Sequence, residues 1–355
     1  MKKVILNDIA ASLGVSKALV SMVLNNQGDK NGISKLTQEK VWQKAKELNY
    51  VPNHIARGLR LGKSMTIGLI VPDIANIFFS RMARIIEDMT NKSGYNLIIS
   101  SSDENIEREL HLIRKFTERQ VDGLILATTL SDKNEIQQLR DEGFPLVLID
   151  RNLSTGDVDY IGVDNVEGSF KAVRHLIDQG YRKIALLKPG PSHLNNLRDR
   201  EAGYRKALKK SGVKIIENLI RAIPFNNLDQ ECDNQIADLL DEGIDAIFTT
   251  NNRLAIKTLQ FARKNNIVIP DQLALVTFDD LDLFEMGHPS VTAVAQPVEQ
   301  MAELAAQRLL DKLLRSRNEK RGESLLLSTL FIPRDSSIKP LCAESEYPKK
   351  YVLPN

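Results

Sequence analysis

The stretch LNDIAASLGVSKALVSMVLNN, residues 6–26, has the pattern of two short helices separated by a tight turn. Asn7 can cap the first helix, Gly14 can end it, and Ser16 can cap a second helix that begins one turn later. Apolar residues recur at helical spacing, so both helices can bury one face in a shared core: Ile9, Leu13, Val15, Val20 and Val23. Helices this short are not stable alone, so the pattern predicts a compact unit whose helices support one another.

A third helix is predicted over about residues 35–49, where Val41, Ala45 and Leu48 fall on one face and complete the same core. Two helices joined by a tight glycine-containing turn and backed by a third form the helix-turn-helix arrangement. Any small helical bundle shares this spacing, so the pattern alone leaves that alternative open. We place this all-α domain at residues 1–50.

The charge of the chain is distributed unevenly. Residues 1–63 contain eleven Lys and Arg residues against four Asp and Glu residues, a formal charge of +7, which leaves −5 for the rest of a chain whose net charge is +2. A basic head on an acidic body is typical of a protein that binds a polyanion through one end. A merely solvated basic surface would look the same, so charge alone does not decide between the two.

The next stretch, NYVPNHIARGLRLGKS at residues 49–64, predicts a short helix of low stability. Asn53 can cap it, but Gly58 costs so short a helix about 1 kcal/mol relative to Ala. Such a segment frays when free and can order on a partner. Its GLRLGKS has three residues between the glycines where a phosphate-binding loop needs four, so it does not indicate nucleotide hydrolysis.

The motifs DIA…GVS…VS.VLN and YVPN..AR.LR together resemble those of the LacI-type (LacI/GalR) bacterial transcription regulators, and the resemblance continues to about residue 335. It implies a homodimer that places two recognition helices in successive major grooves of a pseudo-palindromic double-stranded operator. It also implies a linker at residues 51–64 whose hinge helix, about 54–60, inserts Leu59 into the minor groove. The residues that we expect at the DNA are Asn7, Ser16, Lys17, Ala18, Ser21, Met22, Asn25, Asn53, Arg57 and Leu59.

By this resemblance, Lys17, Ala18 and Met22 face the base edges. Family members commonly carry Arg at the position of Met22, and a methionine cannot make a bidentate contact with guanine. Sequence reading is then left to Lys17, to methyl contacts, and to the shape and bending of the DNA. The loop NNQGDKNGIS, residues 25–34, is also longer than the usual family turn, so we expect an operator that differs from the common ones.

From Met65 onward, short apolar runs alternate with amphipathic segments. Runs such as MTIGLIV, DGLILA and LALVTF have the continuous apolar character of parallel strands covered on both faces. The alternation predicts an α/β body of doubly wound parallel sheets in two lobes. It resembles the type I periplasmic sugar-binding fold, in which the chain crosses between lobes three times. We place this effector-binding and dimerisation domain at residues 65–335, with lobe 1 at about 65–162 and 293–322, lobe 2 at about 163–292 and 323–335, and a tail at 336–355.

Ligands of such sheets bind beyond the carboxyl ends of the strands. The resemblance to ribose-type binding proteins implies that residues at these ends hold the ligand: Asn76, Phe78, Phe79, Asp150, Arg151, Arg200, Asn251, Asp279 and Gln296. Aromatic faces stack on C–H surfaces while carboxylates, amides and guanidinium groups bind hydroxyls, so the predicted ligand is a monosaccharide.

Some of these assignments have alternatives. Asp150 and Arg151 could form an ordinary salt bridge, and one of the two phenylalanines could belong to the core. His193, in a loop near Arg200, is a further candidate for the ligand site and could instead point into solvent.

The expected function is that of a transcription regulator, a repressor, whose operator binding is controlled allosterically by a small ligand. A regulator that senses a purine, a sugar phosphate or a protein partner would have the same head and is the alternative. We do not expect an enzyme, because GxSxG, HExxH and GxGxxG motifs are absent. The five histidines lack metal-ligand spacing, so neither a metal nor a cofactor is expected.

The sequence also bears on location. No apolar run approaches the roughly 20 residues needed to cross a bilayer. The opening MKKVILND breaks off before a secretory apolar segment could form. We therefore expect a cytoplasmic protein without a membrane partner.

Overall fold

The computed structural model describes residues 4–50, 63–153, 158–190, 193–314 and 322–339. The chain divides into two compact units, an N-terminal unit that ends at Ser64 and a C-terminal unit that begins at Met65. We call them the head and the body and describe each by itself. Among the described residues, no single helix is both long enough and apolar enough to span a membrane.

The head contains α1 (Leu6–Leu13), α2 (Lys17–Leu24) and α3 (Lys35–Glu47). The chain bends by 112° between α1 and α2, within the range of a helix-turn-helix. Gly14 has a φ of +66°, a left-handed conformation that ends α1 at little cost only for glycine. The Ser16 hydroxyl accepts a hydrogen bond from the Leu19 N–H at 3.1 Å, so its predicted capping role is confirmed.

The predicted cap of the first helix was wrong. Helix α1 begins at Leu6 with Ile5 at the cap position, and Asn7 lies exposed in the first turn. The carboxylate of Asp8 accepts a hydrogen bond from the Ile5 N–H at 2.8 Å. An acidic side chain in the first turn satisfies a free N–H group as well as a capping asparagine would, and the helix starts two residues earlier than predicted.

The three helices of the head share one apolar core, as predicted. Ile9, Val20, Val23 and Val41 are each at most 1% exposed. The long loop before α3 is held by Gln38, whose amide donates to the carboxylate of Asp29 and to the Ile33 carbonyl oxygen, both at 2.8 Å. The additional loop length is therefore ordered by α3 itself.

The body contains two six-stranded sheets. The first has the order β11-β5-β4-β3-β1-β2, with every neighbouring pair parallel: β1 (Thr66–Val71), β2 (Asn96–Ser101), β3 (Gly123–Leu126), β4 (Leu146–Ile149), β5 (Asp159–Val163) and β11 (Ser324–Leu327). The second has the order β12-β10-β9-β8-β6-β7: β6 (Ile184–Pro189), β7 (Ile220–Ile223), β8 (Ala246–Thr249), β9 (Ala274–Phe278), β10 (Thr292–Ala295) and β12 (Leu330–Ile332). Only β12 is antiparallel to its neighbour, β10, among these described strands.

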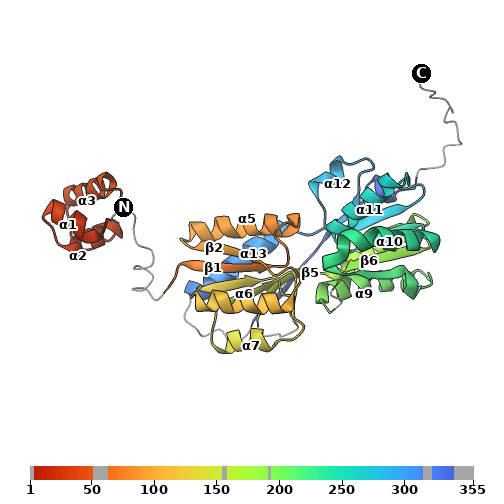
Figure 1. Ribbon diagram of the computed structural model, residues 1–355, viewed down its shortest axis with the longest axis horizontal. Helices are drawn as coiled ribbons and strands as arrows, with labels where there is room; N and C mark the ends of the chain where they lie inside the picture. The colour runs from red at the N-terminus through yellow and green to blue at the C-terminus, as the bar shows by residue number, and fades with distance from the viewer. Residues whose placement is uncertain (1–3, 51–62, 154–157, 191–192, 315–321, 340–355) are drawn as a thin grey trace, which may run out of the picture. The chain divides into compact units, whose positions relative to one another are not determined.

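Helices cover both faces of each sheet, as doubly wound topology requires (Figure 1). In the first sheet Ile67 and Leu69 join the core beneath α5 and α13, whereas Ile70 joins the core beneath α6 and α7. The second sheet divides its side chains in the same way. One face packs against α8 and α9, and the other packs against α10 and α11. The bounds are α5 (Ile77–Lys92), α6 (Ile106–Glu118), α7 (Asn134–Asp141), α8 (Asn165–Asp178), α9 (Asn195–Lys210), α10 (Leu228–Asp241), α11 (Asn252–Lys264), α12 (Asp282–Met286) and α13 (Val298–Leu314).

The chain passes between the two sheets three times, but two crossings differ from the predicted positions. Strand β10 lies in the second sheet and β11 in the first, so these crossings follow residues 295 and 327 instead of 292 and 322. Both strands are only four residues long. An apolar run this short could belong to either sheet. Which sheet it joins is decided by the neighbouring strand with which it pairs.

The predicted tail also begins too early. Ser336 and Ser337, in the 3-10 turn η3 (Asp335–Ser337), are fully buried. The Ser336 hydroxyl donates to the Leu275 carbonyl oxygen at 2.6 Å, and the Ser337 hydroxyl lies 2.8 Å from His175 Nε2. The body therefore extends past residue 335, and residues 340–355 lie outside the described residues.

Candidate functional site

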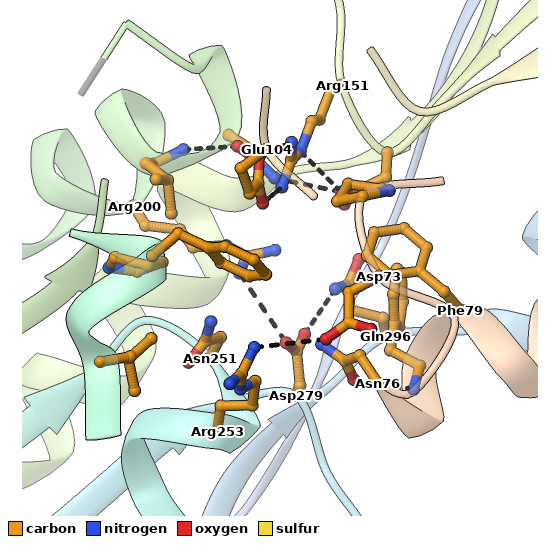
Figure 2. A pocket seen from close by; sticks show the side chains of 18 residues that line it. Asp73, Asn76, Phe79, Glu104, Arg151, Arg200, Asn251, Arg253, Asp279 and Gln296 are labelled. Atoms are coloured by element: carbon orange, nitrogen blue, oxygen red, sulfur yellow. Dashed lines mark hydrogen bonds and ion pairs between the residues drawn. The ribbon is translucent and has the colours of Figure 1, made fainter. Parts of the chain in front are cut away.

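The topology places a cleft between the two sheets. In each sheet the order reverses at its first strand, with β2-β1-β3 in one and β7-β6-β8 in the other. Loops diverge at such a reversal and leave a crevice beyond the carboxyl ends of the strands. The structure has a cavity there, and the residues that line it come from both sheets (Figure 2). Nine of the ten predicted ligand residues line this cavity: Asn76, Phe78, Phe79, Asp150, Arg151, Arg200, Asn251, Asp279 and Gln296.

Two aspartates follow directly after strands from different sheets. Asp150 follows β4 and Asp279 follows β9, and their φ angles are +63° and +71°. This left-handed conformation costs a non-glycine residue roughly 1 to 2 kcal/mol. Each carboxylate accepts a hydrogen bond from a side-chain amide, Asp150 from Asn196 at 3.1 Å and Asp279 from Gln296 at 2.6 Å. The strained turns hold both carboxylates at the cavity.

Arg200 of α9 supplies the cation between them. Its guanidinium carbon lies 3.8 Å from the centre of the Phe278 ring. Nε donates to the Asn165 side-chain oxygen at 2.8 Å and Nη1 donates to the Thr250 carbonyl oxygen at 2.6 Å. Nη1 is also 4.0 Å from the carboxylate of Asp279. Arg200 is only 3% exposed, so its position is determined by stacking and by hydrogen bonds.

Burial perturbs the titration of both aspartates. Desolvation raises the pKa of Asp150 and of Asp279 above the ordinary value, and the charge of Arg200 opposes the rise in each case. The two carboxyl groups also act on each other, because the charge of Asp279 raises the pKa of Asp150 further. The site thus combines two buried carboxyl groups with one fixed guanidinium group.

Arg151 is paired with a residue that the sequence did not single out. Its Nη1 and Nη2 donate to the two carboxylate oxygens of Glu104, each at 2.6 Å. The alternative pair with Asp150 is looser, since Arg151 Nε lies 3.6 Å from its carboxylate. Desolvation lowers the pKa of Arg151, but the charge and hydrogen bonds of Glu104, together with the charges of Asp150 and Glu109, outweigh it and the net shift is upward. Arg151 is therefore held as a charged partner of Glu104.

Several predicted residues have structural bonds as well. Phe78 and Phe79 stack edge to face at 5.0 Å and are 6% and 5% exposed, so both belong to the core as well as to the cavity wall. The side-chain oxygen of Asn76 caps α5 by accepting from the Phe78 N–H at 3.1 Å. Asn251 caps α11 in the same way, accepting from the Leu254 N–H at 3.0 Å. These asparagines fix the helix starts that border the cleft.

The predicted recognition helix α2 has a weakly polar outer face. Ser16, Lys17 and Ala18 are exposed, and Ser21, Met22 and Asn25 are partly exposed. The amide of Asn25 donates back to the Ser21 carbonyl oxygen at 2.6 Å. The three predicted hinge contacts, Asn53, Arg57 and Leu59, lie outside the described residues.

Comparison with known proteins agrees with both units. The model of the lacI family of bacterial regulatory proteins matches residues 5–53, and that of a periplasmic binding protein-like domain matches residues 173–337. Over 309 residues the chain is 33% identical to catabolite control protein A of Priestia megaterium, a match that covers 86% of this chain and 91% of that protein. This chain belongs to the LacI family. It is a DNA-binding regulator of transcription.

Other LacI-family proteins match over a similar extent. The ribose operon repressor of Halalkalibacterium halodurans is 33% identical over 310 residues, 87% of this chain and 90% of that protein. The solved structure of a LacI family transcriptional regulator from Enterococcus faecium with bound ribose is 30% identical, with a TM-score of 0.67, and covers 77% of this chain and 98% of that one.

One ligand residue predicted for this LacI-family chain lies elsewhere. His193 is absent from the cavity wall, and its Nε2 lies 2.8 Å from the Thr129 carbonyl oxygen in the other lobe. Further pairs link the lobes at the cleft, among them Arg253 with the carboxylate of Asp73 at 3.2 Å and the Asn252 amide with the Asn76 side-chain oxygen at 2.9 Å. The cavity inside these contacts is about 40 Å³, room for on the order of three water molecules. The space inside these contacts is therefore smaller than a ring-sized ligand.

Sequence reasoning missed three charged or polar residues of the LacI-family cleft, Glu104, Asn196 and Arg253. Glu104 follows β2 by three residues, so the rule of strand carboxyl ends could have found it. Asn196 and Arg253 lie in the first turns of α9 and α11, where only the helix direction shows that they face the cavity. The described residues contain no group of three or more His, Cys, Asp or Glu side chains that could hold a metal ion.

Proposed function

We propose that this LacI-family chain acts in the cytoplasm as a homodimeric repressor whose grip on a pseudo-palindromic operator is controlled by a monosaccharide in the cleft. The observation that carries this proposal is the convergence of Asp150, Asp279 and Arg200, all less than 7% exposed, on one cavity between two lobes. Buried polar groups need partners, and a molecule with several hydroxyls supplies them in the geometry of a ring.

The chemistry of the cleft supports a sugar. A carboxylate can accept from two neighbouring hydroxyls, and the guanidinium group of Arg200 can donate to ring or hydroxyl oxygens. The rings of Phe78 and Phe79 form an apolar wall beside these polar groups. The Enterococcus faecium regulator, which is 30% identical over most of this body, was solved with ribose. A monosaccharide is the smallest molecule that would engage the aspartates, the arginine and an aromatic wall together.

Control of DNA binding would operate through the two lobes. Ligand entry requires the pairs Asp73–Arg253 and Asn76–Asn252 to separate, and the bound ligand would then set the closure of the lobes. Through residues 51–64 this change would reach the head. A coupling free energy of about 1 to 3 kcal/mol would change operator affinity by roughly 5- to 150-fold.

The surface of the body supports the homodimer. Ile77 at the start of α5, and Leu283 and Met286 of α12, are 46%, 58% and 74% exposed. The two helices are neighbours, since Arg81 of α5 lies 3.6 Å from the carboxylate of Asp282 in α12. Large apolar side chains gathered at an exposed junction mark an interaction surface. Sedimentation equilibrium should give twice the chain mass, and Leu283→Glu should shift it toward the monomer.

A thermal-shift screen of the purified full chain against monosaccharides, sugar phosphates and purines tests the ligand. We expect a response to a monosaccharide and its loss in Arg200→Met, while Arg174→Met, in an exposed pair on α8, keeps it. Operator duplexes selected from a random library would then report DNA affinity with and without that sugar. A response to purines alone, or a sugar that leaves DNA affinity unchanged, would refute the proposal.

A further inference from the structure

The buried pair of Glu104 and Arg151 occupies one side of the cleft, opposite Asp279 and Gln296 (Figure 2). Their side chains are 7% and 8% exposed. Both terminal nitrogens of Arg151 are bound by the one carboxylate, each at 2.6 Å, in a bidentate arrangement. A ligand carboxylate or phosphate that bound Arg151 in a bidentate manner would need the same two nitrogens, because that is the geometry in which arginine binds such groups. Glu104 therefore occupies the two atoms through which Arg151 would bind an anionic group.

The pair is supported from the protein side. The Thr129 hydroxyl donates to the carboxylate of Glu104 at 3.3 Å. The Thr129 N–H donates to a second buried carboxylate, that of Glu109, at 2.6 Å, and the charge of Glu109 also raises the pKa of Arg151. Since the carboxylates of Glu104, Glu109 and Asp150 all act on Arg151, its positive charge is neutralised before any ligand arrives.

The other charged groups that line the cavity add no net positive charge. The lining contains the carboxylates of Asp73, Glu104, Asp150 and Asp279 and the guanidinium groups of Arg151, Arg200 and Arg253. Four acids against three bases give a formal charge of −1. With all seven groups ionised, the lining thus offers an anion no excess of positive charge in a desolvated space, and an anion without a counter-charge there is unfavourable.

Among the residues that the structure describes, two fully buried side-chain atoms of the lining are left without a hydrogen bond. They are Nε of Arg151, a donor, and Oε1 of Gln296, an acceptor, and both are buried. A hydroxyl group both donates and accepts, so hydroxyls satisfy either atom, whereas a carboxylate or phosphate oxygen satisfies only the donor. The two unpaired atoms and the charge of the lining thus both favour a neutral ligand that carries hydroxyl groups.

We infer that Glu104 determines the charge class of the ligand: by occupying Arg151 it makes the cleft accept a neutral polyhydroxylated molecule and reject sugar phosphates and sugar acids. This inference rests on the proposed function, because it concerns the ligand of the same cleft. It goes further in naming the residue that excludes anions.

Matched pairs of probes test it on the full chain: ribose with ribose 5-phosphate, glucose with glucose 6-phosphate, and glucose with gluconate. Dissociation constants from calorimetry should favour the neutral member of a responding pair by at least about 10-fold in the wild type. A unit charge several ångströms away, at an effective dielectric constant of about 20, corresponds to roughly a 10- to 100-fold change in a binding ratio. Glu104→Gln should therefore reduce the preference for the neutral member by about that factor.

Two controls isolate the charge of Glu104. Glu104→Asp keeps the carboxylate and should keep the wild-type preference. Glu107→Gln removes one charge from the exposed side of α6, three residues away, and should leave the ratio unchanged. Removing Glu104 leaves Arg151 without its main partner, so the unliganded melting curve of each variant is recorded first. If Glu104→Gln does not fold, the wild-type ratio carries the test alone.

Each result has one interpretation. A wild type that prefers the phosphate or the acid overturns this inference but leaves the ligand-controlled regulator intact. A neutral preference that survives in a folded Glu104→Gln overturns the role of Glu104. A wild type that responds to no member of any pair overturns the proposed sugar ligand together with the inference drawn from it.

Discussion

Arg200→Met offers the most direct test of how the cleft is held together. Methionine keeps an unbranched apolar stem, but it removes the guanidinium group that stacks on the Phe278 ring and donates to Asn165 and Thr250. It also removes the cation beside Asp279, 4.0 Å away. Because Arg200 is 3% exposed, no water-filled space takes over its role, and the two aspartates lose their counter-charge.

The expected cost follows from this burial. Removing one partner of a buried charged cluster destabilises by roughly 3 to 5 kcal/mol at neutral pH. For a body of this size that corresponds to a fall in Tm of roughly 6 to 20 °C. The pKa of Asp150 and that of Asp279 are already raised, so their contribution to stability is complete below the unfolded value and is lost as the pH rises through the folded one. Without Arg200 both values rise further, so the penalty should be smaller at about pH 5 than at about pH 7.5.

Differential scanning calorimetry at both pH values, with Arg174→Met as the surface control, measures this effect. A double-mutant cycle with Asp279→Asn isolates the pair, and its coupling energy should approach 2 to 4 kcal/mol, roughly the interaction of unit charges at this distance in an effective dielectric constant of about 20. The same penalty at both pH values, together with no recovery in the double variant, would refute the electrostatic account of the cleft.

Three further perturbations test the packing, the cap and the lobe contacts. Gly203→Ala should destabilise the body by about 1 to 3 kcal/mol in urea unfolding, because the added methyl meets the Val166 carbonyl oxygen where α8 and α9 pack; an unchanged midpoint contradicts this close approach. Ser16→Ala should cost α2 about 1 kcal/mol and weaken DNA binding, whereas Ser12→Ala, which removes no cap, should not; equal effects on hydrogen exchange of α2 would count against the cap. Arg253→Met should favour separated lobes by up to about 1 kcal/mol and increase the radius of gyration in solution scattering, and an unaltered profile would show that the Asp73 pair does not hold the lobes.

The sequence predicted the fold because its signals are local. Ile9, Val20 and Val23 recur at helical spacing, and all three are buried in the head. Apolar runs such as Thr66–Val71 have no polar face and lie between two helical layers. Strand carboxyl ends meet at one edge of a parallel sheet, so Asp150 and Asp279 could be placed at the cleft before any pairing was known.

Pairing between distant residues was decided only by the tertiary structure. Arg151 binds Glu104 across 47 positions and Arg253 binds Asp73 across 180, distances over which no periodicity carries information. The same reason explains the sheets of β10 and β11 and the position of His193, since each depends on a neighbour that is far away along the chain. The local spacing of apolar residues and the residues at turns determine which segments of this LacI-family protein form helices and strands. Which charges neutralise each other in its cleft is determined by the three-dimensional contacts between those elements, because electrostatic energy depends on separation in space and on burial.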